Sequence, residues 1–231
     1  MTNRKLNGAF YTPSLVANFV VDYLAERLSD REKLHVLEPS AGDGAFVNSL
    51  KLHPFFSKAL VKLVAVEKNK KELQKISSKK GTSFLQKYHG DFLDFNLRNR
   101  KKFDLIIGNP PYIKKNHLTS RQVDLCRAIH RNANLSSREP KNIWTAFVVS
   151  SIDMVRDDGA ISFILPSEFL QVKFADEVRS LLYAKFQRVE FLNFRELIFD
   201  ADGQNTVLVI AYKKSNDPGV FFGSINRVED L

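Results

Sequence analysis

Short apolar runs alternate with amphipathic segments and polar turns along most of the chain. Runs of about four to eight branched apolar residues are typical of buried parallel strands. This pattern predicts strands over residues 34–38, 60–66, 84–89, 103–108, 160–165, 186–194 and 206–213. Helices are expected over residues 13–28, 68–80, 142–155 and 166–184. The alternation predicts an α/β domain with a mostly parallel, doubly wound sheet, and its last two strands, joined only by a loop, favour an antiparallel edge hairpin.

The first predicted helix has a recognisable start. Thr12 is expected to be the N-cap and Pro13 the first helical residue, because hydroxyl side chains favour the cap and proline tolerates the first turn. Apolar residues at helical spacing predict the stripe that this helix buries, which comprises Leu15, Phe19, Tyr23, Leu24 and Leu28.

Length and composition are those of one globular domain. The chain has 231 residues, of which 44% are hydrophobic and 26% charged, and this suits a single domain over residues 1–231. No apolar run is long enough to span a membrane and no signal peptide precedes Asn7, so no membrane partner is expected. The single cysteine, Cys126, excludes an internal disulfide and favours a reducing, cytoplasmic location.

The charge is basic overall and concentrated in one segment. The formal net charge is +9, which favours a polyanionic partner. Residues 113–141 carry seven basic and two acidic side chains, a local net charge of +5. An exposed helical insertion with solvated charges is one interpretation of this segment, and contact with DNA phosphates is the other. The candidate phosphate-binding residues are Lys114, Lys115, Arg121, Arg127 and Arg131.

The segment with the most distinctive chemistry follows the predicted strand 103–108 and reads Asn109, Pro110, Pro111 and Tyr112. Two prolines fix two φ angles and remove two backbone donors, so a rigid loop is expected at a carboxyl strand end, where α/β sheets place ligands. The Asn109 side-chain oxygen and the Pro110 carbonyl are acceptors beside the flat ring of Tyr112. Such a site suits a planar group that carries an NH2. The alternative is a strand that ends in a proline turn, with Tyr112 packed on the surface.

Other strand ends carry residue types that suit a nucleoside ligand. Gly42 and Gly44 follow the first strand, and glycine lets the backbone approach a ligand closely. Glu67 ends the second strand, where a carboxylate can accept both hydroxyls of a ribose. Asp91 and Phe92 follow the third strand and could contact an adenine. The alternatives are a tight turn, a solvated strand end, and an Asx-type turn over a buried phenylalanine.

Taken in order, these motifs resemble those of the amino-group DNA methyltransferases of the gamma order. The resemblance runs from Gly8 to about Lys213 and includes the amino-terminal Gly-Ala-Phe-Tyr-Thr-Pro, the loop Glu-Pro-Ser-Ala-Gly-Asp-Gly-Ala-Phe and Asn-Pro-Pro-Tyr. It implies a Rossmann-like fold, S-adenosylmethionine as the cofactor, double-stranded DNA as the partner and no metal. The catalytic residues that it implies are Asn109, Pro110, Tyr112 and Phe199, the last as a second aromatic against the target base.

The resemblance also assigns cofactor-binding residues and subdivisions of the domain. Residues 8–35 are the amino-terminal motif and helix, 34–112 the cofactor half with the catalytic loop, 113–141 a basic insertion, and 142–213 the second half with the target-base aromatic. The implied cofactor-binding residues are Tyr11, Thr12, Glu38, Ser40, Ala41, Gly42, Gly44, Phe46, Glu67, Asp91, Phe92 and Asn109. Family members usually continue into a domain that recognises the DNA sequence, so such a domain, or a specificity subunit, is an expected partner.

The function implied by the resemblance is methylation of adenine N6 after base flipping, in a restriction-modification or related defence system. Asn109 and Pro110 would accept the hydrogens of the amine and free its lone pair, so no general base is needed. A protein-glutamine N5 or RNA guanine-N2 methyltransferase is an alternative, because Asn-Pro-Pro-Tyr also suits those amines. A non-enzymatic nucleic-acid-binding or scaffolding subunit is a further alternative, although every implied position retains a competent residue type.

Overall fold

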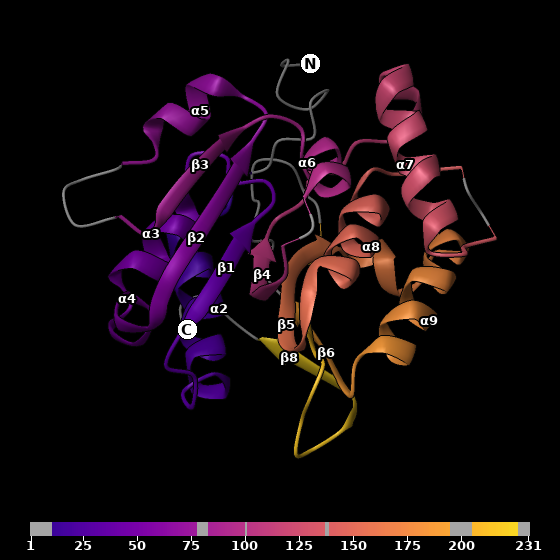
Figure 1. Cartoon of the computed structure of the whole chain (residues 1–231). Coiled ribbons are helices and arrows are strands. Elements are labelled where there is room, and N and C mark those ends of the chain that lie inside the picture. The colour runs from indigo at the N-terminus through magenta and orange to yellow at the C-terminus, as the bar shows by residue number, and fades with distance from the viewer. Residues whose placement is uncertain (1–10, 78–82, 100, 137–138, 195–204, 226–231) are drawn as a thin grey trace.

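The structure, a computed structural model, describes residues 11–77, 83–99, 101–136, 139–194 and 205–225. Within these ranges the chain forms an eight-stranded sheet in the order β3-β2-β1-β4-β5-β7-β6-β8 (Figure 1). Neighbouring strands among β1 to β5 are parallel, β7 runs antiparallel between β5 and β6, and β8 is parallel to β6. The predicted fold class, with its antiparallel pair of closing strands, is confirmed. The strands are β1 (Leu34–Glu38), β2 (Leu60–Glu67), β3 (Leu85–His89), β4 (Phe103–Gly108), β5 (Val155–Pro166), β6 (Arg188–Phe194), β7 (Thr206–Tyr212) and β8 (Gly219–Ile225).

Helices cover both faces of this sheet (Figure 1). One face packs against α2 to α5 and the other against α6 to α9, so the sheet separates two apolar cores. Strand β4 shows how one strand serves both: Leu105 and Ile107 face one core and Ile106 faces the other, as the alternation of strand side chains requires. The helices are α2 (Ser14–Arg27), α3 (Ala45–Leu52), α4 (Pro54–Ala59), α5 (Lys70–Lys75), α6 (Phe92–Arg98), α7 (Ser120–Asn132), α8 (Trp144–Met154) and α9 (Asp176–Lys185).

The first helix differs from its prediction in both cap and buried stripe. Its N-cap is Pro13, and no side chain caps it, so the predicted capping role of Thr12 is wrong. Leu15 is 47% exposed, and the fully buried face is shifted by one residue. The reason lies in the tertiary structure, because this face packs in the apolar core that α2 shares with α3 and the sheet. The buried residues of α2 are Val16, Ala17, Val20, Val21, Leu24 and Ala25.

Two further differences lie in the second half of the chain. The helix predicted over residues 166–184 is divided into two short 3-10 turns, at Ser167–Leu170 and Lys173–Ala175, and α9. Strand β8, which the sequence pattern did not predict, extends the sheet beyond the hairpin and stacks Phe221 under the Arg188 guanidinium at 3.7 Å. Its two glycines lower the strand propensity, and pairing with β6 supplies what the local sequence lacks.

Two further properties of the described ranges concern the length of the helices and the single cysteine. None of their helices is long and apolar enough to cross a membrane. Cys126 is buried in α7, and burial raises the pKa of its thiol to about 12, so the thiolate is not formed near neutral pH.

Candidate active site

A pocket of about 650 Å³ lies over the carboxyl ends of β1 and β4. Strand order reverses between these two strands, and open α/β sheets bind ligands at such a point because the adjoining loops diverge there. Its volume is in the range of small-molecule sites. Of the predicted cofactor-binding residues, Gly44 alone does not line the pocket. The lining ones are Tyr11, Thr12, Glu38, Ser40, Ala41, Gly42, Phe46, Glu67, Asp91, Phe92 and Asn109.

The loop after β1 takes a turn that favours glycine. Gly42 has a φ of 54° and Gly44 a φ of 94°, a left-handed conformation that residues with a Cβ rarely adopt. A Cβ on Gly44 would also lie 2.9 Å from the Cγ1 atom of Ile76. The turn brings the start of α3 to the pocket, where Ala45 and Phe46 form part of the wall.

Glu67, at the end of β2, is held by backbone donors. Its Oε2 accepts a hydrogen bond from the Gly42 N–H at 2.8 Å, and its Oε1 accepts one from the Asn69 N–H at 2.7 Å. The carboxylate therefore connects the loop after β1 to the segment after β2, and both contribute residues to the lining of the pocket. Each carboxylate oxygen has two lone pairs, so these bonds are compatible with further bonds from two ligand hydroxyls.

Glu38, at the end of β1, is a buried carboxyl group with 2% of its surface exposed. It accepts a hydrogen bond from the Val47 N–H in the first turn of α3, while its Oε2 has no hydrogen-bond partner within the described ranges. Burial raises the pKa of Glu38 well above its usual range, and the nearby charges of Glu67 and Asp43 raise it further. A cationic ligand group in the pocket would offset this cost by stabilising the ionised form.

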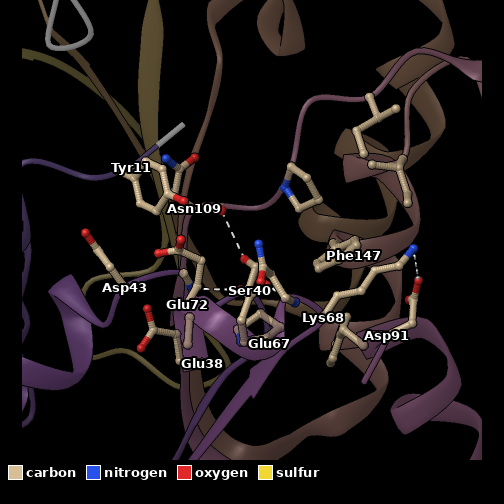
Figure 2. A pocket seen from close by; sticks show the side chains of 18 of the residues that line it. Tyr11, Glu38, Ser40, Asp43, Glu67, Lys68, Glu72, Asp91, Asn109 and Phe147 are labelled. Carbon is tan, nitrogen blue, oxygen red and sulfur yellow. Dashed lines mark hydrogen bonds and ion pairs between the residues drawn. The ribbon is translucent and has the colours of Figure 1, made fainter. Parts of the chain in front are cut away.

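Asp91 begins α6 in the way that the Asx-turn alternative describes. Its Oδ1 accepts a hydrogen bond from the Leu93 N–H at 3.0 Å, so it is the N-cap of this helix. Its Oδ2 pairs with the Lys68 ammonium at 3.3 Å (Figure 2). Phe92 beside it is buried and packs on Phe147, with ring centroids 4.9 Å apart. Contact of Asp91 with an adenine stays a prediction.

Asn109, directly after β4, has hydrogen bonds on its backbone and at both ends of its side chain. Ser40 donates its hydroxyl to the Asn109 carbonyl at 3.0 Å, which joins the cofactor loop to the Asn-Pro-Pro-Tyr loop (Figure 2). The Asn109 Nδ2 donates to the Thr12 Oγ1 at 3.3 Å, and the Asn109 Oδ1 accepts from the Tyr112 hydroxyl at 2.8 Å. The carboxamide is thus held by Thr12, from before α2, and by Tyr112 of its own loop.

Of the other predicted catalytic residues, the two that the structure describes are not among the residues that line the pocket. Pro110 is buried, and Pro111 rather than Pro110 lines the pocket. The ring of Tyr112 is 8% exposed, is part of the core under α6 to α9, and does not line the pocket. The alternative that packs Tyr112 on the surface is therefore wrong, and its contact with a target base stays a prediction. Phe199 lies outside the described residues.

Several pocket residues were missed by the sequence analysis. Asp43 and Glu72 add to its carboxylates. Burial raises the pKa of Tyr11, and the charge of Glu72 and a hydrogen bond with it raise this pKa further. Phe147 is on the buried helix α8, where nothing in an apolar pattern separates a ligand-facing ring from a core ring. The basic insertion also contributes to the wall, through Ile113, His117, Thr119 and Gln122.

Most of the candidate phosphate-binding residues in the basic segment form ion pairs with carboxylates. Lys115 pairs with Glu139, and Arg127 pairs with both Glu139, at 2.5 Å, and Asp124, at 3.1 Å. Arg121 pairs with Asp94 of α6 at 2.7 Å. Among the described residues, Lys114 and Arg131 are the two phosphate-binding candidates that are exposed and have no ion pair with a carboxylate.

The fold is one that S-adenosylmethionine-dependent methyltransferase domains share. It is the fold of a candidate class I S-adenosylmethionine-dependent methyltransferase from Listeria monocytogenes, with a TM-score of 0.76 at 12% identity over 96% of this chain and 67% of the other. A methyltransferase subunit of a type I restriction-modification system from Streptococcus thermophilus gives a TM-score of 0.72 at 19% identity, over 93% of this chain and 47% of the other.

The chain belongs to the Eco57I restriction-modification methylase family, whose model matches residues 30–199. It is similar to the type II methyltransferase M.AccI of Acinetobacter calcoaceticus, with 25% identity over 100% of this chain and 41% of M.AccI. It is also similar to the modification methylase CviBIII of Paramecium bursaria Chlorella virus NC1A, with 27% identity over 76% of this chain and 42% of CviBIII. The chain thus spans about two-fifths of the length of these relatives. The family and fold imply S-adenosylmethionine as the cofactor.

Proposed function

We propose that this chain methylates the N6 amine of adenine in DNA, as the methyltransferase part of a restriction-modification system. The observation that carries this proposal is the Asn-Pro-Pro-Tyr loop at the end of β4, which brings Asn109 into the wall of the acidic pocket. Membership of the restriction-modification methylase family supports methyl transfer. The names of M.AccI and CviBIII, a type II methyltransferase and a modification methylase, support DNA as the substrate.

The residues of the pocket fit S-adenosylmethionine. The ligand carries an ammonium and a sulfonium cation, and five carboxylates line the cavity against one lysine, Lys68. Glu38 supplies a buried oxygen without a partner among the described residues, and Glu67 supplies a fixed carboxylate for the ribose hydroxyls. The glycine turn at Gly42 and Gly44 leaves room where a Cβ would be strained or would clash.

When bound, S-adenosylmethionine supplies an electrophilic methyl group. The adenine amine is a poor nucleophile because its lone pair is delocalised into the ring. The Asn109 oxygen and the Pro110 carbonyl would accept its two hydrogens and favour tetrahedral geometry at nitrogen, which frees the lone pair for in-line attack. The methylated ammonium then loses a proton to water, so this chemistry does not need a general base.

An adenine reaches this site only if it leaves the DNA duplex, at a cost of roughly a few kcal/mol. Tyr112 and Phe199 are the proposed aromatic contacts that offset this cost, and Tyr112 would have to be uncovered to present its ring. Lys114 and Arg131 are the best candidates for phosphate contacts, because neither is neutralised by a carboxylate of the described chain. Such contacts hold DNA without reading its sequence.

The decisive test offers alternative substrates in parallel. The chain is incubated with S-adenosylmethionine and DNA, RNA or protein, and the methylated product is identified by mass spectrometry. We expect N6-methyladenine in the DNA sample. Methylguanine in RNA or methylglutamine in protein, without N6-methyladenine, would refute the proposed substrate.

Asn109→Ala separates chemistry from binding. It removes an acceptor that is needed when the amine is activated, so kcat should fall by about 100- to 1,000-fold. The dissociation constant for S-adenosylmethionine, measured by calorimetry, should change little. Near-native turnover of this variant would show that the acceptor mechanism is wrong.

A further inference from the structure

The hydroxyl group of Tyr112 lies between two acceptors. It is 2.8 Å from the Asn109 Oδ1 and 3.0 Å from the carbonyl oxygen of Ile164, near the end of β5. A phenol has one proton, so it can donate fully to one of these oxygens at a time. Burial raises the pKa of Tyr112 well above its usual range, which keeps this proton in place at neutral pH.

The direction of that proton is coupled to the orientation of the Asn109 carboxamide. The two ends of a carboxamide have the same shape, and a half-turn exchanges an acceptor for a donor. The Thr12 hydroxyl, 3.3 Å from the Asn109 Nδ2, can donate or accept and so permits both orientations. The Ile164 carbonyl can only accept. When Tyr112 donates to Asn109, an oxygen must be at that end; when Tyr112 donates to Ile164, the nitrogen can take its place.

The orientation matters for the chemistry, because only the oxygen of Asn109 can accept a hydrogen from a target amine. A carboxamide oxygen accepts two hydrogen bonds, so the bond from Tyr112 is compatible with a second bond from the amine. We propose that the Tyr112 hydroxyl is a positioning group that holds the Asn109 carboxamide with its oxygen available to the amine. This inference rests on the proposed function, and it gives the buried side chain of Tyr112 a role that does not require its ring to face a base.

The test is Tyr112→Phe, which removes the hydroxyl and keeps the ring. Without the hydroxyl, the reversed carboxamide should become populated, and kcat should fall about tenfold, as expected for one lost hydrogen bond. The KM values for S-adenosylmethionine and DNA should stay within about twofold, because neither ligand is bound through this hydroxyl. Tyr183→Phe is the matched control, since Tyr183 is an exposed tyrosine of α9, away from the pocket lining. It should behave like the unmodified protein.

A second measurement reports on orientation without turnover. In protein labelled with 15N-asparagine, the side-chain NH2 signals of Asn109 are assigned by their loss in Asn109→Asp. They should shift in Tyr112→Phe and stay unchanged in Tyr183→Phe. If Tyr112→Phe does not fold, the unmodified protein is used, and nuclear Overhauser contacts of the Asn109 NH2 group should connect it to the Thr12 side chain and not to the Tyr112 ring. Contacts with the Tyr112 ring instead would overturn the positioning role.

The outcomes separate the two proposals. Unchanged Asn109 signals in Tyr112→Phe, or shifted signals with unchanged kcat, would overturn the positioning role. Shifted signals in a chain that methylates none of the offered substrates would refute the proposed function and leave the hydrogen-bond geometry supported. Shifted signals together with a fall in kcat alone would support both.

Discussion

The acidic side of the pocket and the basic segment of residues 113–141 carry opposite charges and hold them differently. In the pocket, the carboxyl groups of Glu38 and Glu67 accept hydrogen bonds from backbone N–H groups and have no basic side chain as a partner among the described residues. In the basic segment, Arg121 and Arg127 meet carboxylates, which cancel their charge locally. The first arrangement leaves a field for a cationic ligand, whereas the second leaves little for a phosphate.

The difference shows why a count of charges does not identify a binding surface. The segment 113–141 has a local charge of +5 in the sequence, yet much of it serves to attach α7 to neighbouring elements, as Arg121 does with Asp94 of α6. The pocket, in a chain with a net charge of +9, is lined by five carboxylates. The charge that can act on a ligand depends on which side chains already form ion pairs within the protein. Those pairs form only when the chain folds.

Removal of a pocket carboxylate should have the largest effect, and this effect is on the affinity for the cofactor. Glu67→Ala removes a carboxylate that would accept two hydrogen bonds from the ribose, and charge-assisted bonds are strong. The dissociation constant for S-adenosylmethionine should rise by about 100-fold. Titration calorimetry measures this value, with Glu26→Ala as the control because Glu26 is an exposed residue of α2. Equal affinities for the two variants would remove Glu67 from the site.

The next effect is on stability, through Glu38. Because its pKa is raised by folding, its contribution is fully present below the ordinary glutamate value of 4.5 and is lost as pH rises through the folded value. Across that window one such group costs about 1.4 kcal/mol per pH unit. Glu38→Gln cannot ionise, so without cofactor its unfolding temperature should exceed that of the unmodified protein by a margin that grows with pH.

Thermal unfolding between acidic and mildly alkaline pH measures that margin. Glu26→Gln is the control, since Glu26 is exposed. With S-adenosylmethionine present, the advantage of Glu38→Gln should shrink, because the ligand cations stabilise the ionised carboxylate. A margin that is constant with pH would show that Glu38 does not ionise over the range tested.

The smallest effects are expected in the basic segment, on DNA affinity. They distinguish the cations that pair with a carboxylate from those that do not. Replacing Lys114 and Arg131 by glutamine should weaken DNA binding about equally for unrelated duplexes and flatten the salt dependence by up to about 0.9 per lost phosphate contact. Replacing Arg121 and Arg127 should change DNA affinity less and slightly lower the unfolding temperature, because exposed ion pairs contribute little. A larger loss of affinity from the second pair would mean that DNA competes for these cations.

The order and type of the main elements follow from local pattern. Branched apolar runs predict β1, β2 and β4, because a strand buried on both faces needs apolar residues throughout. The glycines at 42 and 44 permit a positive φ, and the two prolines after β4 fix φ. Both effects act within single residues, so these loops can be placed without knowing the rest of the fold. The same reasoning placed Glu67 and Asn109 at the carboxyl ends of their strands, and both line the pocket.

Other features depend on contacts between distant parts of the chain, and the sequence alone could not predict them. β8 needs its pairing with β6, and the partner of Arg121 is on α6, 27 residues earlier. The packing of helices on the sheet places Phe147 in the pocket lining and buries Tyr112. Local preference determines which elements form and where their reactive residues stand, because turn and strand geometry act over a few residues. Which charges are cancelled, and which rings and hydroxyls face the pocket, was decided by tertiary packing, because those energies arise only when remote side chains meet.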